Sequence, residues 1–162
     1  MNSKLDIEII AIGKLKEEYL RKAEMIFVRS IGKVSNIRLI ELKDEKTKDG
    51  AGEKELTRIK DLEGQSILKY LDAKATSIAM DISGKKVTSA QFRGEIDKVR
   101  SLEGKIQFII GGSLGLSENV LSKVTKRISF GSMTYPHQLF RIMLLEELIK
   151  CFEMRNLEER VQ

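Results

Sequence analysis

Residues 105–116 read KIQFIIGGSLGL, and this stretch decides the fold class. The apolar, β-branched run from Lys105 to Ile110 predicts a buried strand, and the glycines after it predict a turn. Ligands of open α/β sheets bind where the strands end, and glycine lets the backbone approach a ligand closely. The spacing matches neither a dinucleotide-binding fingerprint nor a P-loop. The glycines therefore leave two interpretations open, a structural turn and a ligand-binding turn.

On either side of this stretch, predicted strands alternate with predicted helices. We expect strands at residues 5–12, 37–42, 76–80, 105–110 and 128–130. We expect helices at residues 14–28, 53–70, 88–99, 117–126 and 136–155. The alternation predicts an α/β fold with a mostly parallel sheet covered by helices on both faces. No linker or internal repeat divides the chain, so we expect a single domain over residues 1–162.

Three local signals refine these elements. Ser89 can cap the helix at 88–99. Gly64 is expected to interrupt the helix at 53–70, because glycine weakens a helix interior. Residues 81–84 read DISG, a turn signature that should end the preceding strand.

Composition narrows the function classes. Only one cysteine, Cys151, and one histidine, His137, are present, so an internal disulfide, a thiolate-rich zinc site and a multi-histidine metal site are excluded. The net charge of +5 permits a nucleic-acid partner without requiring one. Nothing resembles a signal peptide or a membrane span, so we expect a cytoplasmic protein without a metal.

A second stretch, residues 129–141, reads SFGSMTYPHQLFR. Ser132 or Thr134 can cap a helix there, and Pro136 suits the first helical turn. His137 could accept a proton or contact a ligand, although a lone histidine more often serves packing. Arg141 follows one turn later and could hold an RNA phosphate or a carboxylate, whereas its purely structural partner would be Glu146 or Glu147.

The final predicted helix is apolar over a wide arc. Such a helix is either deeply buried or lies at a subunit interface, and both can hold. Cys151 lies in this helix and is expected to be a small core residue. The apolar positions are Leu139, Ile142, Met143, Leu145, Ile149 and Phe152.

Motifs along almost the whole chain are similar to the ribosomal RNA large-subunit methyltransferase H family of the SPOUT superfamily. The most specific block is Ser132 to Thr134 with Pro136 to Gln138 and Arg141. The other matching segments are 13–20 (GKLKEEYL), Ile40-Glu41, 43–46 (KDEK), Glu63-Gly64, Ile67-Leu68, Met80-Asp81, Gly84-Lys85, Ser89, 108–112 and Gly115-Leu116.

The resemblance implies more than the pattern of elements does. It implies a C-terminal trefoil knot that holds S-adenosylmethionine, a homodimer, and methylation of N3 of a pseudouridine in 23S rRNA on the assembled ribosome. His137 and Arg141 become candidate catalytic residues. The implied cofactor contacts are Met80, Gly112, Phe130, Gly131, Ser132, Met133, Thr134 and Tyr135.

Three positions depart from the family pattern. Family members usually end in Tyr-His and a basic residue, whereas this chain reads Arg160-Val161-Gln162 there. Ile149 replaces the usual tyrosine of the last helix, and residues 26–31 (IFVRSI) replace a basic stretch of the first helix. A second interpretation follows, in which a divergent relative keeps the cofactor pocket but acts on another RNA, or binds RNA or the ribosome as a homodimer without catalysis.

Overall fold

In the computed structural model, which describes residues 4–102 and 104–161, five parallel strands form one sheet in the order β2-β1-β4-β3-β5. Side chains are described as far as Glu153, so those of Arg160–Gln162 lie outside the described residues. The strands are β1 (Asp6–Ile12), β2 (Asn36–Leu42), β3 (Thr76–Lys86), β4 (Lys105–Ile110) and β5 (Lys126–Ser129). The helices are α1 (Glu18–Ile31), α2 (Glu53–Leu68), α3 (Ser89–Ser101), α4 (Glu118–Leu121) and α5 (His137–Val161).

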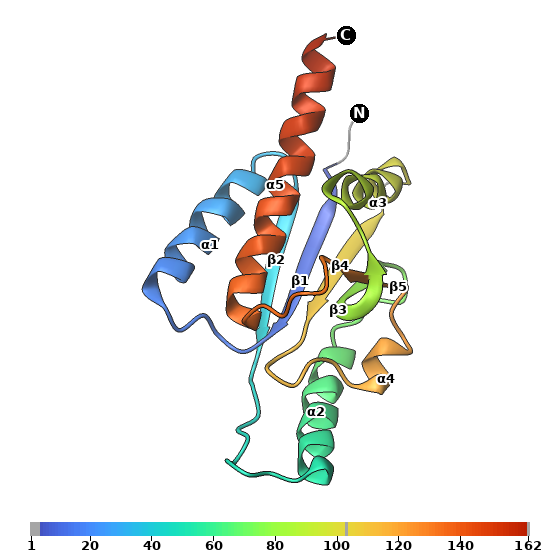
Figure 1. Cartoon of the computed structure of the whole chain (residues 1–162). Coiled ribbons are helices and arrows are strands. Elements are labelled where there is room, and N and C mark those ends of the chain that lie inside the picture. The colour runs from blue at the N-terminus through green and yellow to red at the C-terminus, as the bar shows by residue number, and fades with distance from the viewer. Residues whose placement is uncertain (1–3, 103, 162) are drawn as a thin grey trace.

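Helices cover both faces of the sheet, as the alternation of elements predicted (Figure 1). Alternate strand residues point to opposite faces. Ile7 and Ile9 of β1 pack into a cluster with residues of α1, α3 and α5. Ile10 and Ile12 pack into a second cluster with residues of α2 and α4. Burial on both faces explains why β1 and β4, in the middle of the sheet, are nearly continuous apolar runs.

Two predicted helices were partly wrong. The first helix begins at Glu18 rather than at residue 14, because the preceding segment packs against α5 and the Lys16 amide donates to Gln138 Oε1 (2.8 Å). The helix expected at 117–126 is a single turn, α4. Thr125 is then held beside β3, where its amide donates to Ser77 Oγ (2.9 Å), and β5 begins at the next residue.

The turn expected at residues 81–84 does not end β3. The strand continues to Lys86, and its register shifts so that Met80 and Lys85 both lie opposite Ile128. The DISG sequence therefore forms an irregular bulge of four residues within β3 and does not end the strand. Gly84 is required within the bulge, because a methyl group there would lie 2.6 Å from the carbonyl carbon of Arg127.

Two other local predictions were also wrong. Thr88, not Ser89, caps α3, and it forms a reciprocal capping box with Gln91. Gly64 does not interrupt α2, which runs on to Leu68. A methyl group on Gly64 would lie 2.3 Å from Ser117 Oγ, so this glycine allows α2 to pack closely against the start of α4.

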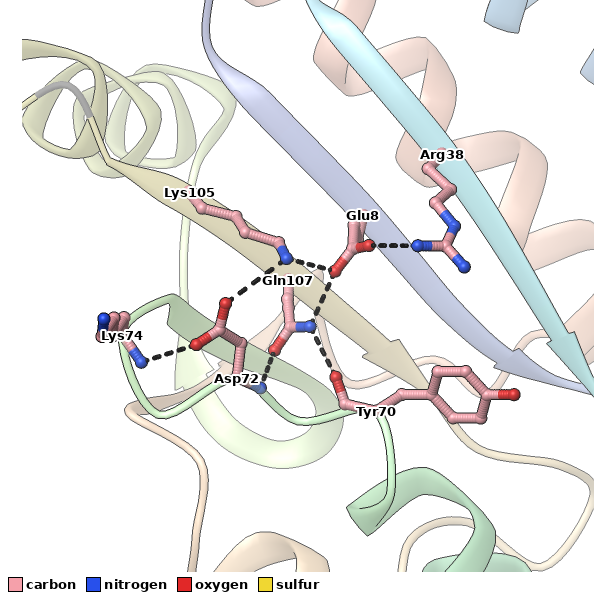
Figure 2. Close-up of polar contacts among 7 residues, drawn as sticks. All are labelled: Glu8, Arg38, Tyr70, Asp72, Lys74, Lys105 and Gln107. Carbon is pink, nitrogen blue, oxygen red and sulfur yellow. Dashed lines mark hydrogen bonds and ion pairs between the residues drawn. The ribbon is translucent and has the colours of Figure 1, made fainter.

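A polar network closes the amino ends of the strands, at the opposite edge from the glycine turn (Figure 2). Gln107 is fully buried, and its Nε2 donates to Glu8 Oε1 and to the Tyr70 carbonyl, each at 2.8 Å. Lys105 Nζ lies 2.8 Å from Glu8 Oε1 and 3.4 Å from Asp72 Oδ2. The network holds the segment between α2 and β3 against the sheet.

Candidate functional site

The predicted cofactor residues lie on three adjacent strands or directly after them. Met80 pairs in register with Ile128, shortly before Phe130 leaves β5. Gly112 follows the end of β4, which lies beside β3. Carboxyl ends of neighbouring parallel strands form the usual ligand edge of an α/β sheet. The three segments that carry the predicted contacts therefore share one edge.

The glycine turn leaves little space for a side chain at Gly111 and Gly112. Gly112 and Gly115 form an isolated bridge, and the Gly115 amide donates to the Gly112 carbonyl (3.1 Å). A methyl group on Gly111 would lie 2.7 Å from the Gly115 backbone, and one on Gly112 would lie 3.1 Å from Ile12 Cγ2. The structural interpretation of the turn is confirmed, and its bare backbone also suits contact with a ligand.

The segment after β5 is packed against other aromatic side chains at its first residue, Phe130, and is exposed to solvent from Ser132 to Thr134. The Phe130 ring lies 5.3 Å from each of the rings of Phe92 and Phe140, measured between centroids. Gly131 adopts a φ of 134°, which disfavours any side chain, and its amide donates to Ser129 Oγ (3.2 Å). The next residues, from Ser132 to Thr134, are exposed, and Met133 retains 72% of its accessible surface.

His137 begins α5 and lies near the turn that follows β1. A methyl group on Gly13 would lie 3.9 Å from both His137 Nε2 and Asp44 Cγ. Burial lowers the pKa of His137, and the positive charge of Arg141 lowers it further, against an opposing effect of Asp44. A histidine with a lowered pKa is neutral at pH 7 and can accept a proton.

Arg141 is almost completely buried and joins three segments that are distant in sequence. Its Nη1 lies 2.6 Å from Glu41 Oε2 and 3.2 Å from Glu24 Oε2, and its Nη2 donates to the Gly13 carbonyl (2.8 Å). The sequence had suggested Glu146 or Glu147 as structural partners, which was wrong. Burial raises the pKa of Glu24, while the charge of Arg141 acts in the opposite direction.

Glu63 of α2 is a residue to which the sequence assigned no function. Its side chain is 5% exposed, and its Oε2 accepts a hydrogen bond from the Glu45 amide (3.1 Å). A methyl group on Gly112 would lie 3.4 Å from each of its carboxylate oxygens. Burial raises its pKa, and the charges of Asp44 and Glu45 raise it further, against the opposing hydrogen bond from the Glu45 amide.

Two other features lie away from the glycine turn. A cavity of about 430 Å³ opens between α1, α3 and α5, and it shares only Phe130 with the predicted cofactor residues. Cys151 is buried in the core, as expected, and burial raises the pKa of its thiol to about 12. This thiol is therefore protonated at neutral pH and is a poor nucleophile.

Metal sites and membrane spans are not found in the described part of the chain. Within it, no group of three or more histidine, cysteine, aspartate or glutamate side chains could hold a metal ion. Among the described residues, no helix combines the length and apolarity needed to cross a bilayer.

Comparison with known proteins agrees with this geometry. Residues 5–159 match a family model described as a predicted SPOUT methyltransferase. The chain is 46% identical over 152 residues to the ribosomal RNA large subunit methyltransferase H of Clostridium botulinum strain Langeland, covering 93% of this chain and 95% of that protein. The protein of the same name from Clostridium beijerinckii is 45% identical with the same coverage.

Proposed function

Because the chain belongs to the SPOUT methyltransferase family, and is thus an RNA methyltransferase, we propose that it methylates N3 of a pseudouridine in 23S rRNA with S-adenosylmethionine. One observation carries the proposal. Met80 lies on β3, and Gly112 and Phe130 follow the ends of its two neighbours β4 and β5, in a chain that matches methyltransferase H proteins over nearly its full length.

The residues at this edge fit such a cofactor. The glycine turn carries no side chains of its own at residues 111, 112 and 115, so its backbone can supply donors and acceptors for an adenine ring. Met80 and the nearly buried Leu116 supply apolar surface, and the exposed residues Ser132 to Thr134, with the partly exposed Tyr135, supply further polar groups. We assign cofactor binding to Met80, Gly112 and the segment 130–135.

The chemistry requires positioning and the removal of one proton. When bound, S-adenosylmethionine supplies a methyl carbon on a positively charged sulfur, which is already activated for attack. N3 would form a bond to that carbon as the carbon–sulfur bond broke, and N3 would have to lose its proton. We assign the proton to His137 Nε2, because a half-buried imidazole with a lowered pKa is uncharged and able to accept it.

We assign Arg141 a positioning role rather than direct contact with RNA. Its guanidinium is 2% exposed and already holds Glu24, Glu41 and the Gly13 carbonyl. These contacts fasten the first turn of α5 to the turn after β1, and His137 lies on that helical turn. Arg141 would therefore keep the imidazole in place without touching the substrate.

Three further properties belong to the proposal. We propose a homodimer formed by α1 and α5, a trefoil knot formed by the chain that leads into α5, and a cytoplasmic enzyme that acts on the assembled ribosome. Exposed apolar side chains support the dimer: Tyr19, Met25 and Ile26 on α1, and Leu139 on α5. The net charge of +5 supports an RNA partner, which a small protein would recognise mainly by shape.

The test begins with titration calorimetry of S-adenosylmethionine into the purified protein. We expect binding to the wild type and to Gly52→Glu, whose substitution points into open space, but not to Gly112→Glu. Methyl transfer to 70S ribosomes that lack the modification, read by mass spectrometry of 23S rRNA, should then depend on the same variants. Binding without methylation of any ribosomal RNA would favour the non-catalytic interpretation, and no binding would overturn the cofactor assignment.

A further inference from the structure

We propose that the Glu63 carboxylate is the counter-charge that binds and orients a cationic group of the methyl donor. This inference rests on the proposed function and adds a residue to it. Contact with the sulfonium would also make Glu63 a specificity determinant, because the demethylated product lacks that charge, whereas both molecules carry the ammonium.

The position of Glu63 is the first support. Both of its carboxylate oxygens face Gly112, at 3.4 Å from where a methyl group on that glycine would lie. Gly112 also lies close to Ile12, the last residue of β1. The turn that follows Ile12 is the one near His137. Glu63, on α2, therefore lies beside Gly112, one of the predicted cofactor contacts.

The missing counter-ion is the second support. Among the described residues, Glu63 Oε1 has no hydrogen-bond or ion-pair partner, and Oε2 has only the Glu45 amide. Glu8, which is buried to a similar degree, lies beside both Lys105 and Arg38. A buried charge without a counter-ion is costly, so it is retained where a ligand supplies the opposite charge.

The surrounding charge points the same way. The acidic residues nearest to Glu63 are Asp44 and Glu45, and both raise its pKa. A negative potential at this point repels an anionic ligand and attracts a cationic one. S-adenosylmethionine carries a sulfonium and an ammonium against one carboxylate, whereas S-adenosylhomocysteine has no sulfonium, and methylthioadenosine has none of the three charges.

A purely structural role for Glu63 is the competing explanation, because its Oε2 anchors the loop at Glu45. Glu63→Gln separates the two, since the amide oxygen can still accept that hydrogen bond while the charge is removed. Glu53→Gln is the matched control, because Glu53 is an exposed glutamate on the same helix. Thermal unfolding of both variants reports whether the loop anchor has been lost.

The experiment measures the affinities of the wild type, Glu63→Gln and Glu53→Gln for the three ligands by calorimetry. We expect Glu63→Gln to weaken S-adenosylmethionine binding roughly 10- to 100-fold, as loss of a charge-assisted contact does, and to leave methylthioadenosine binding unchanged. If S-adenosylhomocysteine binding weakens equally, the contacted group is the ammonium, and if it does not, the group is the sulfonium.

Three other outcomes would overturn the inference. Equal loss for S-adenosylmethionine and methylthioadenosine, or a lowered unfolding temperature with parallel loss for all ligands, would make Glu63 structural. Unchanged affinities would remove its role while leaving the proposed function intact. Failure of the wild type to bind S-adenosylmethionine would overturn the proposed function and this inference together.

Discussion

At the residue scale, the chemistry of the site depends on how burial changes ionisable groups. His137 and Glu63 are both shielded from water to some degree, and burial lowers the pKa of the first and raises that of the second. In each case burial shifts the protonation equilibrium in the direction of the neutral form. The neutral imidazole of His137 can accept a proton, whereas the Glu63 carboxylate, which lacks a counter-ion, would be stabilised by a bound cation.

His137→Gln should separate catalysis from cofactor binding. Loss of a general base is expected to lower kcat about 100-fold or more, while the Kd for S-adenosylmethionine stays unchanged. Because burial and Arg141 lower the pKa of His137, the wild-type acidic limb of kcat/KM should lie below the ordinary histidine value, and the variant should lack that limb. A variant with an unaltered pH profile would exclude His137 as the base.

Two helical glycines should respond oppositely to the same change. Gly64→Ala should destabilise the protein by about 1–3 kcal/mol, because the new methyl group would displace Ser117 Oγ, which caps α4. Gly94→Ala on α3 meets no atom within 4 Å and should stabilise by up to about 1 kcal/mol. Urea denaturation measures both, and changes of the same sign would contradict the packing argument.

At the element scale, the ends of several helices and strands differ from those predicted by the local sequence pattern, because contacts between elements determine where each one begins and ends. The Ser77–Thr125 hydrogen bonds shorten α4 and start β5 early. The bulge in β3 converts a predicted turn into a continued strand, because residues 85 and 86 find partners on β5. Each boundary depends on a partner that is remote in sequence.

The cap of α3 provides a direct test at this scale. Thr88→Ala removes the side-chain acceptor of the Gln91 amide and should cost about 1 kcal/mol of unfolding free energy. Ser89→Ala, one residue later and exposed, should change it by less than about 0.5 kcal/mol. A larger loss at Ser89 than at Thr88 would restore the original capping assignment.

At the scale of the whole molecule, α5 connects the candidate site to a surface that faces away from the sheet. One side of the helix buries Leu144, Leu145 and Leu148 in the core. Ile142 and Met143 instead line the cavity that opens beside α1. The wide apolar arc of the sequence is thus partly core and partly surface, and the surface part supports the proposed dimer.

Ile26→Glu tests that dimer without disturbing the core, because Ile26 is 62% exposed on α1. We expect the wild type to have a dimeric mass in light scattering and the variant a monomeric mass, since a buried charge opposes an apolar interface. Ile82→Glu, at a 50% exposed isoleucine on β3, is the matched control and should remain dimeric. A monomeric wild type would rule out the dimer.

Much of this protein could be predicted from its sequence alone. The period of the apolar residues indicated strands and helices in the correct order, and the alternation of the two predicted a parallel sheet covered on both faces. The glycine turn and the stretch around Pro136 supplied the candidate cofactor residues. Both kinds of signal depend on residues that are close in sequence, so they can be recognised without knowing which residues are neighbours in space. The single-domain expectation for residues 1–162 stays a prediction.

Only the tertiary structure decided what surrounds each candidate. Arg141 meets Glu24 and Glu41, and Glu63 meets Gly112, across long separations along the chain. These pairings depend on the strand order, in which β4 lies between β1 and β3 and β2 lies at one edge of the sheet. Pairing of charges and burial of a carboxylate depend on distances in space. In a parallel sheet with crossover connections, these distances are fixed only once the whole sheet has formed.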